Sequence, residues 1–187
     1  MRTLTRLVST TALALTCLST QVFAADPSAG FVDFGKFTPP TGGGQFVEIN
    51  VKSPLIGIAV RLTEKAEPEV ADLLRGLESV RVNVIGVDDA NRTELGERLI
   101  KIRTELESKG WERIVTVQEK GQEVGVYLKQ RGSEAIEGVV VTVLESNKEA
   151  VLVNVVGDIR PEKLALLGEK LGIDPLKKVG EATKKKS

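Results

Sequence analysis

The pattern of apolar and polar residues predicts that the folded domain begins near position 45. The segment QFVEINV at 45–51 has the composition of a strand, and SVRVNVIGV at 79–87 alternates as a half-buried strand does. Residues 53–77 carry apolar side chains at helical spacing, and Pro68 starts a second helix or restarts the first. The residues expected on one face of the first helical stretch are Leu55, Ile58, Ala59 and Leu62.

A longer helix is predicted after the second strand, within DDANRTELGERLIKIRTELESKGW at 88–111. Asn91, followed three residues later by Glu94, fits a capping box at the start of this helix, and Gly110 fits its end. The apolar stripe consists of Leu95, Leu99, Ile102 and Leu106. This spacing predicts an amphipathic helix that covers one face of a sheet.

The pattern then changes to four successive strands. Their predicted ranges are 112–120, 122–130, 135–146 and 150–156. Lys120-Gly121 and Asn147-Lys148 are hairpin signals between members of each pair. Alternation along the second of these strands predicts an antiparallel sheet with one buried and one wet face. The expected fold is therefore α+β: a largely antiparallel sheet, built from a four-strand C-terminal meander and two earlier strands, with three to four helices packed on one face.

The closing segment VLVNVVGDIRPEKLALLGEKLGI at 151–173 predicts a buried strand, a turn at Gly157-Asp158 and a helix over 161–171. A helix N-terminus attracts anions through its free N–H groups and its dipole. Here the Asp158 carboxylate would cap that end itself, and Glu162 adds further negative charge. This favours a scaffolding role over a ligand site.

Two asparagines, Asn83 and Asn154, interrupt strands that are otherwise apolar. The preferred interpretation places each of them on a wet or edge face of the sheet. If both lay on one buried face, they would mark a polar pocket, because buried polar groups need hydrogen-bond partners.

The N-terminus indicates export. Two arginines precede a mostly apolar stretch at 7–18, and Val22-Phe23-Ala24 offers a cleavage site, which predicts a signal peptide over 1–24. An alternative is a lipoprotein signal in which Cys17 becomes the lipidated first residue, although the preceding threonine fits that signal poorly. We find no later apolar segment long enough to span a membrane. The expected location is the periplasm or the cell envelope.

Charge gives no indication of nucleic-acid binding. The chain has 26 basic and 26 acidic residues, and removing a signal peptide that holds two arginines leaves a net charge of −2. The one charge run is Lys184-Lys185-Lys186, within a predicted disordered basic tail over 174–187. Residues 45–173 are then expected to form a single α+β domain.

The predicted mature chain offers little catalytic chemistry, because it has neither histidine nor cysteine. A Cys or Ser nucleophile activated by His, and the usual N/S metal sites, have no residues to build them. We expect a non-enzymatic protein with no catalytic residues, no cofactor and no metal. Asp88 and Asp89 lie where a strand leads into a helix, and we interpret them as a helix-start turn rather than a calcium or magnesium site. A hydrolase using Asp88, Asp89 or Asp158 is a third hypothesis.

Residues 25–44, ADPSAGFVDFGKFTPPTGGG, predict a flexible Gly/Pro-rich arm. The arm nevertheless carries Phe31, Phe34 and Phe37, which are large apolar side chains that tend to leave water. Folding back onto the protein's own domain is the preferred interpretation, and docking onto a partner is the alternative. We therefore treat these three phenylalanines as candidate partner-binding residues.

Four stretches of the chain resemble a family. GFVDFGKF, FVEIN, EVADLLRGLESVRVNV and VNVVGDIRPEKLALL resemble a bacterial family of exported proteins known as domain of unknown function number four-two-five-two. The resemblance covers about residues 30–172. It implies export, a small α+β domain and no established enzyme chemistry, and it assigns no functional residues.

The leading hypothesis is an exported, non-enzymatic envelope or periplasmic protein that acts as a protein-interaction or scaffold module. Its envelope partner would pair with an edge strand or accept the phenylalanines of the arm. The alternative is a small-ligand or lipid binder that uses a cleft between helices and sheet, with Trp111 and Tyr127 as wall residues.

Overall fold

The computed structural model describes residues 28–132, 135–146, 148–170 and 172. The elements follow the predicted order, and their bounds are β1 (Phe46–Lys52), α1 (Ser53–Thr63), α2 (Pro68–Arg75), β2 (Leu77–Gly86), α3 (Arg92–Ser108), β3 (Glu112–Glu119), β4 (Gln122–Arg131), β5 (Ala135–Glu145), β6 (Glu149–Ile159), the 3-10 helix η1 (Pro161–Lys163) and α4 (Leu164–Lys170). The predicted signal peptide, the predicted basic tail and Asn147 of the second hairpin lie outside the described residues.

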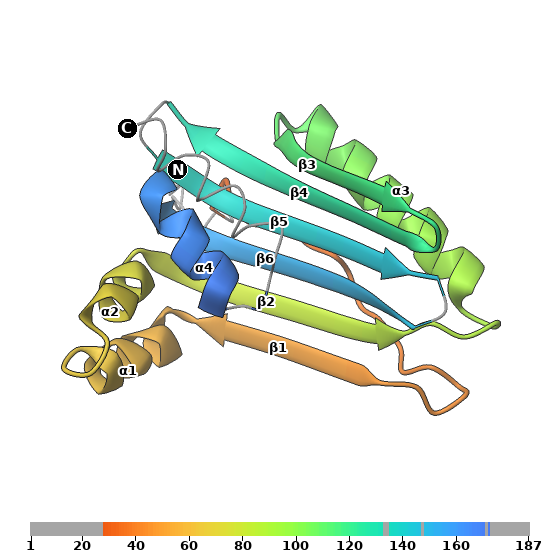
Figure 1. The fold of residues 1–187 in the computed structure, drawn as a ribbon, viewed down its shortest axis with the longest axis horizontal. Helices are drawn as coiled ribbons and strands as arrows, with labels where there is room; N and C mark the ends of the chain where they lie inside the picture. Colours follow the sequence, from red (N-terminus) through yellow and green to blue (C-terminus); the bar gives the residue numbers. More distant parts are fainter. Residues whose placement is uncertain (1–27, 133–134, 147, 171, 173–187) are drawn as a thin grey trace, which may run out of the picture.

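Within the described residues, six strands form one antiparallel sheet in the order β1-β2-β6-β5-β4-β3 (Figure 1). The four C-terminal strands form the predicted meander, with Lys120 and Gly121 between β3 and β4. β2 pairs with β6 on one side and with β1 on the other, so the two earlier strands extend the meander. The α+β fold class is therefore confirmed.

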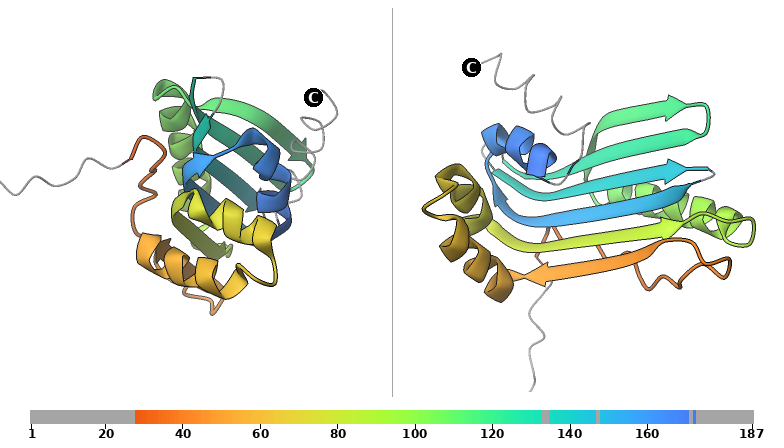
Figure 2. Two further views of the ribbon diagram at one scale, coloured as in Figure 1. Left: turned by 90° about the vertical axis from the view of Figure 1, so that its left-hand side faces the viewer. Right: turned by 60° about the horizontal axis from the view of Figure 1, so that its bottom comes forward.

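The helices cover both faces of the sheet rather than the one face that we expected (Figure 2). We call the face under α1, α2 and α4 the front, and the face under α3 the back. On the front, Ile56, Leu73 and Leu164 pack against the valines of the central strands. On the back, the predicted α3 stripe packs with Tyr127 and Leu152. The central strands are apolar on both faces, so each face requires its own cover.

The predicted turn at Gly157-Asp158 is wrong, because β6 continues through both residues to Ile159. The Asp158 backbone N–H donates to the Gly76 carbonyl at 2.7 Å. Gly157 has a φ of 153°, and a Cβ atom there would lie 2.2 Å from the Gly76 oxygen, so only glycine allows this close approach of β6 to the end of α2.

The Asp158 side chain does not cap the closing helix. Its carboxylate lies 3.2 Å from Arg131 Nη2, and the chain enters η1 at Arg160 without a side-chain cap. The predicted single helix is divided into η1 and α4. Because Asp158 still belongs to the strand, its side chain is too early in the chain to reach the first free N–H groups of the helix.

Candidate functional site

The three phenylalanines of the arm occupy different environments on the back of the sheet. Phe34 is 2% exposed within the back core. Phe37 is half-buried, and its ring centre lies 3.8 Å from Arg98 Cζ, a cation–π distance. Phe31 is 37% exposed beside Arg81. Of these candidate partner-binding residues, Phe31 therefore keeps an accessible ring, whereas Phe34 belongs to the protein's own core.

Asn154 holds the arm against the sheet. Its Oδ1 accepts a hydrogen bond from the Val32 N–H, and its Nδ2 donates to the Gly30 carbonyl, both at 3.0 Å. A Cβ atom on Gly30 would lie 1.8 Å from the Glu137 carbonyl oxygen, so the arm crosses β5 backbone to backbone. This buried side chain supplies the hydrogen bonds that the arm's irregular backbone cannot make with itself.

The interpretation of Asn83 and Asn154 as wet or edge residues is wrong. Both are buried on the back face, and Asn154 is 0% exposed. They do not line one pocket, because Asn154 is occupied by the arm. Within the described residues, Asn83 Oδ1 accepts no hydrogen bond. The sequence pattern missed the role of Asn154 because its partners in the arm are more than 120 positions away.

Asp88 and Asp89 lie in the turn before α3, where a helix-start role was expected. Asp88 Oδ1 accepts hydrogen bonds from the N–H groups of Ala90 and Asn91, both at 2.9 Å. Asp89 points outward and pairs with Arg92 at 3.1 Å. The predicted capping box is wrong, because the Asn91 side chain binds the Asp88 N–H and the Gly86 carbonyl instead of capping α3.

The described part of the chain shows no metal centre and no spanning helix. Nowhere in it do three His, Cys, Asp or Glu side chains gather as metal ligands would. None of its helices combines the length and the apolar character needed to cross a membrane.

The aromatic residues expected to line a ligand cleft lie in different hollows. Trp111 lines a hollow of about 260 Å³ between the arm and the end of α3, together with Phe31. Tyr127 lines a separate cavity of about 190 Å³ between α3 and the β3–β4 hairpin. The single cleft of the small-ligand hypothesis is therefore divided between two places on the back of the sheet.

The front face of the sheet is a grid of β-branched side chains. The row farthest from α1 and α2, which we call the outer row, consists of Val47, Val84, Val151, Val143, Val124 and Val117. Each valine is paired directly with the next across the strands. The neighbouring middle row is Ile49, Val82, Val153, Val141, Val126 and Val115. The sheet thus presents an uninterrupted apolar band from one edge strand to the other.

The helices leave the outer row only partly covered. The third row, which includes Val139 and Val155, is fully buried at its centre in the core that α1, α2 and α4 complete. In the outer row, five of the six valines are half-buried and only Val124 is buried. Figure 1 shows α4 lying across the strands toward their other end. The outer row is therefore the open margin of the front core.

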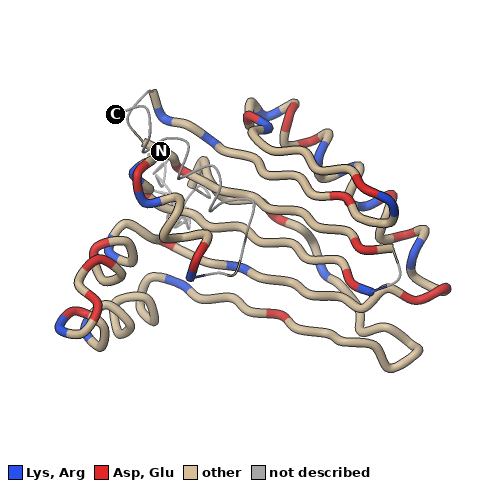
Figure 3. Tube along the Cα trace, in the orientation of Figure 1, with Lys and Arg blue, Asp and Glu red and all other residues tan. Residues whose placement is uncertain are grey.

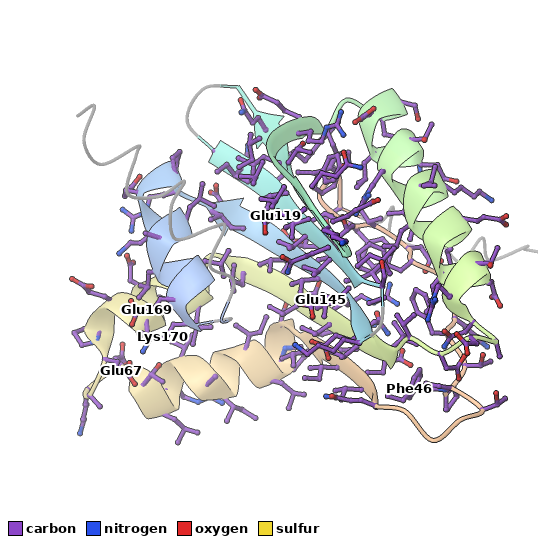
Figure 4. The ribbon with its side chains drawn as sticks, turned by 45° about the vertical axis from the view of Figure 1, so that its right-hand side comes forward. Phe46, Glu67, Glu119, Glu145, Glu169 and Lys170 are labelled. Carbon is purple, nitrogen blue, oxygen red and sulfur yellow. The ribbon has the colours of Figure 1, made fainter. Side chains whose placement is uncertain are left out.

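An acidic rim borders the outer row where the strands end at the hairpins (Figure 3). It consists of Glu119, Glu145 and Glu149, which continue the front-facing alternation of their strands. Lys148 lies 3.3 Å from the Glu145 carboxylate and offsets part of this charge. Figure 4 shows Glu119 and Glu145 far from the Glu67–Lys170 pair, which ties α4 to the start of α2.

Residues 42–167 match the model of a protein family described as Domain of unknown function (DUF4252). The chain belongs to this family. The resemblance seen in the sequence is thus confirmed, whereas export stays a prediction. No curated protein and no solved structure matches the chain. The DUF4252 domain contains all six described strands and the whole outer row. Phe31, Phe34 and Phe37 precede its first residue.

Proposed function

We propose that this protein is an exported, non-enzymatic module of the cell envelope that binds a partner protein through the outer row. The observation that carries this proposal is the unbroken line of six valines, five of them half-buried, across the front of the sheet. Large contiguous apolar patches are rare on monomeric proteins and typically mark a contact with another molecule, and the outer row is a continuous apolar strip that the protein's own helices cover only in part.

The dimensions of the outer row fit an amphipathic helix. Strands lie about 4.8 Å apart, so six strands give a row about 24 Å long. An α-helix of about 16 residues has the same length. Packed helices lie about 8–10 Å apart, which would place such a helix beside α4 and complete the front layer. The partner segment that fits is therefore a helix with one apolar face.

Charge defines the partner helix further. The acidic rim of Glu119, Glu145 and Glu149 borders one side of the outer row. A helix with lysine or arginine on the flank that faces this rim would be electrostatically complementary. A flat, open row favours a helix over an acyl chain, because small-ligand sites enclose most of the ligand surface.

Two observations support a binding role rather than catalysis. The predicted mature chain lacks His and Cys. Asp88 and Asp89, the best carboxylate candidates, are engaged in the turn before α3 and in a surface ion pair. Both observations concern residues outside the outer row, so the tests of partner binding change residues of the outer row.

The first test places a photo-crosslinking side chain at Val143 in cells that produce the protein. A matched position is Ile100, which is 62% exposed on α3 and belongs to the other face. We expect one dominant protein adduct from position 143 and none of that species from position 100. The same adduct from both positions, or adducts to lipid alone, would contradict the proposal.

The second test uses purified mature protein and a synthetic 16-residue Leu/Lys amphipathic helix as the probe. Changing Val84, Val143 and Val151 together to threonine keeps the β-branched shape but places hydroxyls under the helix. Each buried, unpaired hydroxyl costs about 1 kcal/mol or more, so binding should weaken about 100-fold. Ile100→Thr should leave affinity unchanged. Equal affinities for all three proteins, or binding of a fatty acid but not of the helix, would refute the proposal.

A further inference from the structure

A polar cavity lies on the back of the sheet, opposite the outer row. It has a volume of about 190 Å³ and opens between α3 and the β3–β4 hairpin. Its polar lining comes from three elements: Arg103 of α3, Arg113, Thr116 and Gln118 of β3, and Glu123 and Tyr127 of β4. A water molecule occupies about 30 Å³ in the liquid, so the cavity has room for a small molecule.

Arg103 is held in a fixed orientation at the cavity. Its Nε donates to Thr142 Oγ1 at 3.1 Å, and its Nη1 pairs with Glu123 Oε2 at 2.7 Å. Its Nη2 is buried and has no hydrogen-bond partner among the described residues. The guanidinium therefore keeps one oriented donor that the protein itself does not use.

Tyr127 adds a second group without a partner. The residue is 0% exposed, and in the described part of the chain its hydroxyl makes no hydrogen bond. Leaving a buried polar group unpaired costs about 1–3 kcal/mol, so such a group calls for a partner that the protein does not provide.

Gly125 keeps space beside this hydroxyl. A Cβ atom at Gly125 would lie 3.3 Å from the Tyr127 hydroxyl, 2.9 Å from its ring and 3.0 Å from Thr142 Oγ1. Any larger residue would fill the space into which the tip of the tyrosine reaches. The cavity is thus bounded by a glycine next to the unpaired Tyr127 hydroxyl and next to Thr142, the residue that accepts from Arg103 Nε.

We propose that this cavity binds a small carboxylate. One carboxylate oxygen would accept a hydrogen bond from the Tyr127 hydroxyl and the other from Arg103 Nη2. Arg113 also lies at the lining, where its charge is offset by Glu107 at 3.3 Å, so the two donors and not a net positive charge select the ligand. An ionised carboxylate is an acceptor with two oxygens, which matches two unpaired donors. The two donors belong to side chains on the opposite face from the outer row, although Val117 and Val124 at the end of that row also border the cavity. The two tests use different probes and change different residues, so either proposal can fail without the other.

The protonation state of Tyr127 suits this role. Burial raises the pKa of Tyr127, and the nearby Arg103 and Arg113 partly oppose that effect. The phenol is therefore protonated at neutral pH and available as a donor. The charged groups that face it are Arg103 and Glu107 from α3, Arg113 from β3 and Glu123 from β4. A bound carboxylate would raise the pKa further, because it accepts a bond from the neutral phenol and repels the phenolate.

The test exploits the fact that the chain contains a single tyrosine. Tyrosinate absorbance of the whole mature protein is followed against pH with acetate, succinate or inorganic phosphate, and with acetamide as the neutral control. We expect acetate or succinate to move the ionisation of Tyr127 to higher pH and to raise the melting temperature. Acetamide should do neither.

Variants locate the effect. Tyr127→Phe should fold as well as the natural protein, because it removes a hydroxyl that has no partner. The response of its melting temperature to acetate should correspond to binding that is at least about tenfold weaker. Thr104→Ala, at an exposed position one residue from Arg103, should respond like the natural protein.

Three outcomes would overturn the proposal. Equal responses to acetate and acetamide would mean that the charge of the ligand plays no part in binding. A response that Tyr127→Phe retains in full would place the site elsewhere. A response to phosphate alone, or to none of the probes, would exclude a carboxylate as the ligand.

Discussion

The docking of the arm can be tested by a double-mutant cycle on Phe34 and Asn154. Phe34 fills the back core, and truncating a buried phenylalanine to alanine costs about 3–5 kcal/mol. Asn154→Ala removes the partners of the Val32 N–H and the Gly30 carbonyl, at about 1–3 kcal/mol for each group left unpaired. Independent effects would therefore sum to about 5–11 kcal/mol.

We expect the double variant to lose clearly less than this sum. Both side chains act on the same segment, so once one substitution has released the arm, the second has little left to break. The coupling energy should exceed about 1 kcal/mol, because residues that act through one shared element typically couple by about 0.5–3 kcal/mol. Phe34→Ala and Asn154→Ala should each also speed tryptic cleavage after Lys36, which is exposed in the arm.

Urea unfolding followed by Trp111 fluorescence measures the cycle, because Trp111 is the single tryptophan and lies in the same core as Phe34. Additive losses within about 0.5 kcal/mol, together with unchanged cleavage at Lys36, would refute the reasoning. That result would mean that Asn154 stabilises the sheet itself and that the arm contributes nothing through it.

Three further predictions concern single substitutions. Gly30→Ala should release the arm and speed tryptic cleavage at Lys36, because its Cβ would lie 1.8 Å from the Glu137 oxygen. Gly96 has no atom within 4 Å of a Cβ built there, so Gly96→Ala should instead stabilise α3 by up to about 1 kcal/mol, as measured by urea unfolding. The pKa of Asp72 is lowered chiefly by its hydrogen bond from Lys163, so its stabilising contribution is present above about pH 4 and is lost as pH falls through the folded pKa. Asp72→Asn should therefore differ from the natural protein in melting temperature at neutral pH and converge with it near about pH 2, whereas a constant gap would contradict this assignment.

The sequence predicted the meander well because its information is local. The alternation of Val124, Val126 and Leu128 and the turn at Gly121 set both the strands and their pairing. The helix faces were harder to predict. We expected Leu55, Ile58 and Leu62 of α1 on one face, and all three are exposed, while Ile56 and Val60 pack inward. Because α1 is apolar nearly all around, helical spacing alone cannot select the side that is buried.

The features of the candidate sites depend on contacts between distant residues. The outer row exists only through the register of six strands, and no single segment displays it. Similarly, Tyr127 and Arg103 line one cavity because α3 crosses behind β4, and Asn154 binds an arm that precedes it by more than 120 positions. In the sequence, Asn154 was visible as an interruption of an apolar strand, but its partners in the arm were not.

The composition of the outer row also determines how selective it can be. Valine has one side-chain torsion with a strongly preferred setting, so a surface of valines loses little conformational entropy when another molecule covers it. Surfaces that accept many partners rely on methionine, whose flexible chain can reshape itself, and the only methionine of this protein is Met1. A rigid row of this kind should discriminate by shape: it would tolerate few alternative partners, and a single bulky substitution in the partner would be enough to abolish recognition.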